Sequence, residues 1–155
     1  IDSLREMATR ASASCRFSPW VRVEAGAALE RRGDFEGAAS MYLQGARVSD
    51  PPIETDDRLF EQGYEQSVAK DRKERARANM AYGSLLGRRG EYALSASYSS
   101  TAIEIDSSLS GAWINLVTAL ANLGQNTDAA TILNRALQRF PEDPIIQRMA
   151  GRIGP

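Results

Sequence analysis

The sequence predicts an all-α fold of stacked antiparallel helix pairs, on the evidence of a pattern repeated around three glycines. Gly90 and Gly124 lie 34 residues apart, and each separates two runs of apolar residues at helical spacing. Gly33 ends a third run of the same kind. Every copy has a leucine four residues before the glycine and an alanine six residues after it: Leu29 and Ala39, Leu86 and Ala96, Leu120 and Ala130. A register that holds over whole copies indicates a helical repeat.

Each glycine suits the turn between the two helices of a pair. Glycine alone adopts positive φ without a steric penalty from Cβ, so it can end the first helix in the left-handed conformation. The alanines that follow allow the second helix to lie close to the first. Larger residues further along, Tyr42, Tyr98 and Leu133, are expected to fill the space between repeats. Neither helix has enough apolar surface to be stable alone, so stacking supplies the core.

At these positions the chain resembles the tetratricopeptide repeat (TPR) family. The match is strong in the third copy, through Trp113, Leu116, Leu120, Gly124, Ala129, Leu133, Ala136 and Pro141. The second copy has serine where the family prefers alanine and an aromatic residue, at Ser95 and Ser99. The first copy has Gly45 in a position that usually holds alanine. The resemblance implies a right-handed α-solenoid of about three TPR helix-turn-helix repeats.

The repeat register divides the chain, which we interpret as one TPR domain over residues 1–155. Repeats are predicted at 19–52, 76–109 and 110–143. The remaining segments are predicted as an N-terminal helix at 3–14, an inserted helix at 53–75 and a capping helix or partial fourth repeat at 144–153. In the two terminal helices, Leu4, Met7 and Ala8 form one apolar stripe, and Ile145, Ile146 and Met149 form another.

The insertion follows from the distance between the first two glycines. Gly90 comes 57 residues after Gly33, which is one period plus 23. Leu59, Phe60, Tyr64 and Val68 keep helical spacing there, and residues 71–75 contain no stop signal. We therefore expect the inserted helix to continue into the first helix of the second repeat, as a rod roughly 45 Å long. A long helix after an insertion is similar to the layout of immunophilin-type TPR domains.

The resemblance also implies a peptide-binding groove lined by the first helix of each pair. The residues carried over to this chain are Val23, Ala27, Arg31, Met80, Ser84, Arg88, Ile114, Asn115, Thr118 and Asn122. Val23, Met80 and Ile114 form an aliphatic ladder, while the asparagines and Thr118 can bond the backbone of a ligand. The alternative is that the ladder packs against the inserted helix and fills the groove from within.

The carboxylate clamp of the co-chaperones in this family is absent. In those proteins, lysine, asparagine and arginine side chains hold the C-terminal carboxylate of a heat-shock chaperone. The matching positions here are Val23, Ala27, Ala81, Gly111 and Asn115, of which only Asn115 is polar. A buried carboxylate without paired donors is costly, so we expect no binding of chaperone tails through this clamp.

Composition argues against several other functions. The 19 basic and 20 acidic side chains nearly cancel, which disfavours binding to nucleic acid. Histidine is absent and Cys15 is the single cysteine, so we predict no catalytic residues, no metal site and no cofactor. No apolar run approaches the ~20 residues of a membrane span, so we predict no membrane insertion.

These observations favour a non-catalytic interaction module, an adaptor or scaffold that binds a peptide or helical segment of another protein. One alternative is a regulatory or targeting domain of a larger enzyme. Another is a structural TPR unit that associates weakly with itself through its terminal repeat. We expect a cytoplasmic protein, with the alternative that a targeting segment preceded Ile1, since the chain reads as a piece of a longer one.

Overall fold

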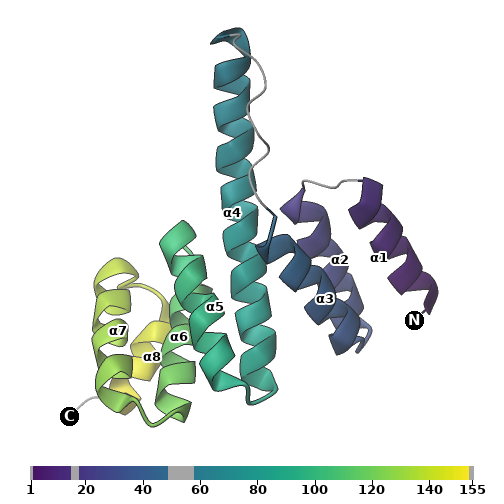
Figure 1. Ribbon diagram of the computed structural model, residues 1–155. Helices are drawn as coiled ribbons and strands as arrows, with labels where there is room; N and C mark the ends of the chain where they lie inside the picture. The colour runs from purple at the N-terminus through teal and green to yellow at the C-terminus, as the bar shows by residue number, and fades with distance from the viewer. Residues whose placement is uncertain (1, 15–17, 49–57, 154–155) are drawn as a thin grey trace. The chain divides into compact units, whose positions relative to one another are not determined.

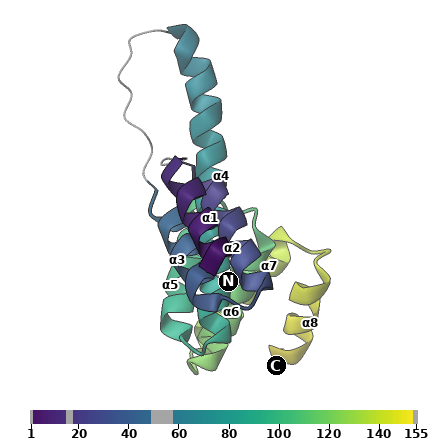
Figure 2. The ribbon, with the colours of Figure 1, turned by 90° about the vertical axis from the view of Figure 1, so that its right-hand side faces the viewer.

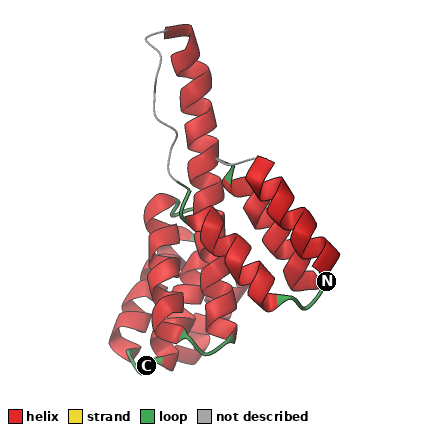
Figure 3. Ribbon diagram, turned by 45° about the vertical axis from the view of Figure 1, so that its right-hand side comes forward, coloured by secondary structure: helices red, strands yellow, loops and turns green. Residues whose placement is uncertain are grey.

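The computed structural model describes residues 2–14, 18–48 and 58–153, and within these ranges every element is a helix (Figures 1 and 3). The helices are α1 (Asp2–Ser14), α2 (Pro19–Arg31), α3 (Phe35–Ala46), α4 (Arg58–Arg88), α5 (Tyr92–Ile105), α6 (Ser110–Asn122), α7 (Asn126–Arg139) and α8 (Pro144–Ile153). The predicted all-α helical repeat fold is confirmed. None of the described helices is both long enough and apolar enough to cross a membrane.

The chain forms two compact units, Ile1–Asn79 and Met80–Pro155, and the division falls within α4. The first unit contains α1, α2, α3 and the N-terminal part of α4. The second contains the rest of α4 and the helices from α5 to α8. The repeat boundaries given by the sequence register stay predictions.

The same turn joins the two helices of each pair. Gly33, Gly90 and Gly124 have φ values of 79°, 79° and 75°, and among the described residues only glycines have positive φ. At the first turn, the N–H of Gly33 donates to the carbonyl of Glu30 at 2.9 Å, and the N–H of the next residue donates to Leu29 at 3.0 Å. This pair of bonds is the Schellman motif, and it recurs at the other two glycines.

The residue after each glycine is the N-cap of the second helix, which begins one residue later. The carbonyls of Asp34, Glu91 and Gln125 accept the first helical bond at 2.9–3.0 Å. Only Asp34 also uses its side chain, whose Oδ1 accepts from the N–H of Gly37 at 3.0 Å. Three residues therefore separate the last residue of one helix from the first residue of the next in each pair, which makes the turns short.

The long helix α4 has the predicted continuity. It extends over 31 residues, which at 1.5 Å per residue is about 46 Å, and it includes the acidic and basic stretch from Asp71 to Arg75 without a break. Figure 1 shows it as the longest helix of the chain. Residues 53–57 of the predicted insertion lie outside the described residues.

In the first unit, α1 packs on α2 and α2 packs on α3 (Figure 2). Ala8 of α1 and Leu29 of α2 are buried, and the ring of Tyr42 lies where a side chain at Gly26 would be. Arg5 bonds both carboxylate oxygens of Asp34, which fastens α1 to the turn between α2 and α3.

Two residues of the predicted apolar stripes lie outside the cores. Met7 is 57% exposed, since α1 is a terminal helix covered along one side only and Met7 is on its flank. Ile145 is 44% exposed, whereas its neighbour Ile146 is 1% exposed. Adjacent helical residues differ by about 100° in direction, so α8 can bury only one of the two isoleucines against α7.

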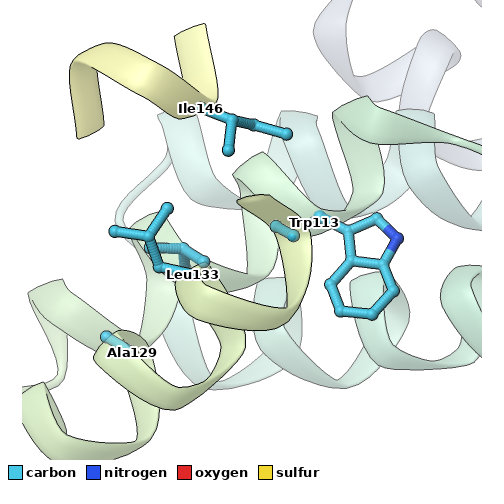
Figure 4. Packing of buried hydrophobic residues seen from close by; sticks show 6 residues of the cluster. Trp113, Ala129, Leu133 and Ile146 are labelled. Atoms are coloured by element: carbon cyan, nitrogen blue, oxygen red, sulfur yellow. The ribbon is translucent and has the colours of Figure 1, made fainter. Parts of the chain in front are cut away.

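The core of the second unit lies between α6, α7 and α8. Its buried residues are Trp113, Val117, Ala129, Leu133, Ala136 and Ile146. Figure 4 shows Ile146 of α8 directed toward Leu133 and Trp113. The start of α8 is held by Asp143, whose Oδ1 accepts from the N–H of Ile145 at 2.9 Å and of Ile146 at 3.2 Å. These bonds lower the pKa of Asp143, because they stabilise the carboxylate form.

The serines that depart from the TPR pattern explain how α4 and α5 approach each other. Ser95 and Ser99 are buried, and the Ser95 hydroxyl donates to the carbonyl of Gly83 at 2.8 Å. A Cβ added at Gly83 would lie 2.7 Å from Ser99 Oγ and 3.2 Å from Ser95 O. A glycine on one helix and small polar residues on the other therefore replace the alanine and aromatic contact of the family.

The left-handed turn can be tested with two alanine substitutions that differ only in backbone conformation. At both Gly124 and Gly151 an added Cβ would meet no atom within 4 Å, but only Gly124 has positive φ. We expect Gly124→Ala to lower the free energy of unfolding by about 1 kcal/mol in urea denaturation. Gly151→Ala, in a helical position, should leave stability unchanged or slightly raise it. Equal losses in the two variants would contradict this explanation of the turn.

The Arg5–Asp34 contact predicts a dependence of stability on pH. The Arg5 guanidinium, and then the N–H of Gly37, lower the pKa of Asp34 from 3.8 to about 2. The unfolded chain therefore takes up this proton at higher pH than the folded chain, and the free energy of unfolding falls as pH falls from about 4 to about 2.

Asp34→Asn keeps an N-cap side chain but removes the charge. In urea denaturation over this pH range, we expect the variant to lose less stability than the wild type. Parallel losses in the two proteins would show that Asp34 is not responsible. Asp143 contributes in the same direction in both proteins, so the comparison isolates Asp34.

Candidate peptide-binding site

A cavity of about 230 Å³ lies between α4, α5 and α6 in the second unit. Five of the residues predicted for the groove line it together: Ser84, Arg88, Asn115, Thr118 and Asn122. Its other lining residues are Gly83, Gly87, Tyr92, Ser95 and Ala119. The five predicted residues come from segments about 30 positions apart in the sequence, because α4 and α6 are the first helices of successive pairs.

The two asparagines are anchored through their amide nitrogens. Asn115 Nδ2 donates to the backbone carbonyl of Met80 at 3.2 Å, and Asn122 Nδ2 donates to that of Thr118 at 2.8 Å. A carbonyl can only accept, so these bonds fix which atom of each amide is the nitrogen. Within the described part of the chain, the two Oδ1 atoms have no partner, which leaves them able to accept from a ligand N–H.

The basic residue of the cavity is Arg88, in the last turn of α4. Its Nη1 donates to Ser84 Oγ at 3.0 Å, which directs the guanidinium along the cavity side of the helix. The adjacent Arg89 pairs with Glu91 at 3.1 Å. Both cations also lie near the C-terminal end of α4, where they offset the helix dipole.

Small residues give the cavity its space. Gly83 and Gly87 are on α4, and Ala119 is on α6. A Cβ at Gly87 would approach Ser95 Oγ to 3.2 Å. The cavity therefore exists because these three positions carry no side chain or only a methyl group.

Sequence reasoning did not include Tyr92 and Ser95, which belong to the second helix of the pair. The family pattern assigns groove residues to first helices only. The turn at Gly90 places the first turn of α5 directly against the end of α4, so these two side chains reach the cavity wall. The glycine was visible in the sequence and could have indicated them.

The other five predicted residues do not line this cavity. Met80 lies against Gly111, where an added Cβ would be 2.9 Å from the methionine sulfur. Ile114 packs on the core of the second unit. In the first unit, Val23 is 8% exposed and belongs to the core, Ala27 is half-buried and Arg31 is exposed. Val23 therefore offers little surface to a ligand.

The chemistry of the cavity is that of hydrogen bonding. Its lining contains no carboxylate, thiol or imidazole, so it holds no general base and no set of metal ligands. Over the described ranges of the chain, no three residues of the metal-binding types gather in one place. The cavity offers amide oxygens, hydroxyls and one guanidinium, which suit the polar groups of a peptide backbone.

Comparison with known proteins agrees with the fold. The tetratricopeptide repeat profile matches residues 110–153, which include α6, α7 and α8. No curated protein matches the chain.

Three solved structures similar to this chain are TPR domains. One is the C-terminal TPR-containing domain of an FK506-binding protein from Plasmodium falciparum, with a TM-score of 0.67 and 16% identity over 88% of this chain and 85% of the other. The first TPR of Spaghetti (RPAP3), bound to the HSP90 peptide SRMEEVD, has a TM-score of 0.61 and 17% identity over 88% and 90%. The Arabidopsis OM64 TPR domain has a TM-score of 0.60 and 17% identity over 88% and 93%.

The fold, the three glycine turns and these comparisons agree on the kind of helical repeat at residues 110–153. The chain contains a tetratricopeptide repeat and has the fold of TPR domains, as the sequence predicted. Domains of this class generally serve in protein–protein interaction, and one of the similar structures holds a peptide.

Proposed function

We propose that the chain is a non-catalytic interaction module that binds a peptide segment of another protein at the cavity between α4, α5 and α6. The observation that carries the proposal is the convergence of Ser84, Arg88, Asn115, Thr118 and Asn122 on one cavity. A peptide-bound structure with the same fold supports it.

The geometry favours recognition of the peptide backbone over recognition of a strongly charged side chain. The Oδ1 atoms of Asn115 and Asn122 can accept from backbone N–H groups, while the Arg88 guanidinium can donate to a backbone carbonyl. Thr118 and Asn122 are exposed on the same face of α6, one turn apart. An extended or helical segment laid along α6 would reach both.

The proposed role is non-catalytic, because the cavity lining contains no carboxylate, thiol or imidazole that could activate its hydroxyl groups as nucleophiles. The role of regulatory or targeting domain of a larger enzyme stays a prediction, as does self-association through α8. The first is tested by the sequences that flank this chain in its gene. The second is tested by the mass measured in light scattering over a range of concentrations.

The proposal is tested by selecting binders from a displayed library of random peptides and measuring their affinity by fluorescence anisotropy. Thr118→Arg places a long cationic side chain over the cavity, so we expect it to weaken binding by about tenfold or more. The matched control is Thr131→Arg, because Thr131 is an exposed threonine on α7 that does not line the cavity.

The control variant should bind the selected peptides as the wild type does. If both variants bind as well as the wild type, the peptides use another surface and the proposed site is wrong. Circular dichroism of both variants checks that helical content is retained.

A second test concerns acidic chaperone tails. Of the positions that form the carboxylate clamp in co-chaperones, only Asn115 is polar in this chain, and its amide nitrogen already bonds the carbonyl of Met80. Ala81 and Gly111 carry no donor side chain. A carboxylate placed there would lose its hydration without gaining a cation.

We therefore expect a labelled SRMEEVD peptide, the ligand in the Spaghetti (RPAP3) structure, to bind this chain no better than a scrambled peptide of the same composition. Fluorescence anisotropy measures both. Sequence-specific binding of SRMEEVD would refute the assignment of these clamp positions.

A further inference from the structure

A second cavity of about 560 Å³ lies in the same unit, beside the end of α5, the start of α6 and the last turns of α7. It shares no lining residue with the cavity proposed for peptide binding. Its polar and aromatic lining consists of Glu104, Ser107, Trp113, Arg135, Gln138 and Arg139. Glu104 is on α5, Ser107 is in the loop before α6, Trp113 is in the first turn of α6, and the other three residues are on α7. None of them is among the groove residues that the sequence pattern assigns to a ligand.

One backbone carbonyl organises this cavity. The oxygen of Ser107 accepts from Trp113 Nε1 at 3.0 Å and from Arg139 Nε at 2.7 Å. The guanidinium of Arg135 lies over the Trp113 ring, 5.6 Å from its centroid. The Ser107 carbonyl therefore holds the indole and the Arg139 guanidinium, and the indole ring places Arg135 beside them; both arginines are exposed.

The two positive charges of the cavity are not neutralised within the described residues. Arg135 and Arg139 are four residues apart on α7, a spacing at which like charges repel and destabilise a helix. No carboxylate in the described part of the chain forms an ion pair with either. Glu104, the acidic residue of the lining, accepts from Ser100 Oγ at 3.4 Å instead.

We propose that this cavity binds an acidic peptide segment, with its carboxylates on Arg135 and Arg139 and its side-chain methylenes on the ring of Trp113. Arg139 keeps both terminal nitrogens for a ligand after its Nε bonds Ser107, and Arg135 keeps its whole donor fork. Interaction with the helix dipole explains the presence of a positive charge only at Arg139, because Arg135 is a full turn from the end of α7. The net charge of −1 and the presence of Glu104 disfavour a long polyanion, whose charges would extend beyond the two arginines.

Tryptophan fluorescence provides a direct test. The chain has two tryptophans, so Trp20→Phe leaves Trp113 as the single reporter. Titration with acetylated, amidated tetraglutamate should change the emission of Trp113 in a saturable way, and the neutral tetraglutamine peptide should not. In the same background, Arg135→Gln with Arg139→Gln should weaken the binding of tetraglutamate by about tenfold or more.

Arg148→Gln with Arg152→Gln is the matched control, because it removes two exposed positive charges from α8 and leaves the cavity intact. We expect it to keep most of the affinity at physiological salt. Any of three results would overturn the proposal: equal binding of tetraglutamine, equal losses in the two double variants, or tighter binding of oligouridylate than of tetraglutamate. Circular dichroism confirms that each variant is folded before it is titrated.

Discussion

The left-handed turn at Gly33, Gly90 and Gly124 is the constraint on which the rest of the fold depends. In each turn two backbone bonds close the first helix, and the residue after the glycine is the N-cap of the second. Because only three residues separate the helices of each pair, their directions and their register are set together. The buried small residues next to the turns, such as Ala38, and the cavity beside the turn at Gly90 follow from this geometry.

The continuous helix α4 gives the second unit its first helix without a new N-terminus. Its C-terminal part supplies backbone carbonyls that the packing of α5 and α6 uses: Gly83 accepts from Ser95, and Met80 accepts from Asn115. These bonds place a polar side chain from each neighbouring helix against α4. The same part of α4 carries Gly83 and Gly87, which leave space for the cavity between α4, α5 and α6. Close helix packing and an open cavity therefore occur next to each other.

The two cavities of the second unit differ in chemistry for a physical reason. The one between α4, α5 and α6 has amides, hydroxyls and a single guanidinium, that of Arg88, which bonds Ser84, and this set suits a peptide backbone. The one that includes Trp113 has guanidinium groups without carboxylate partners, which suits acidic side chains. Two surfaces with different preferences on one small unit would allow it to hold two segments at once.

The sequence by itself determined the class of fold, the three turns and the continuity of α4. These depend on local rules: glycine at positive φ, apolar spacing along a helix, and the absence of a stop signal between Asp71 and Arg75. Half of the residues that the sequence indicated for the groove line the cavity between α4, α5 and α6. The sequence could indicate them because family spacing fixes which face of a first helix a residue occupies.

Only the tertiary structure decided the contacts between residues that are distant in sequence. Arg5 and Asp34 form an ion pair, and the Arg135 guanidinium lies over the Trp113 ring, although no local pattern connects either pair. The burial of Val23 also depends on what packs over it. Helical periodicity gives the direction of a side chain from its own axis, whereas its partner is chosen by where the neighbouring helix lies.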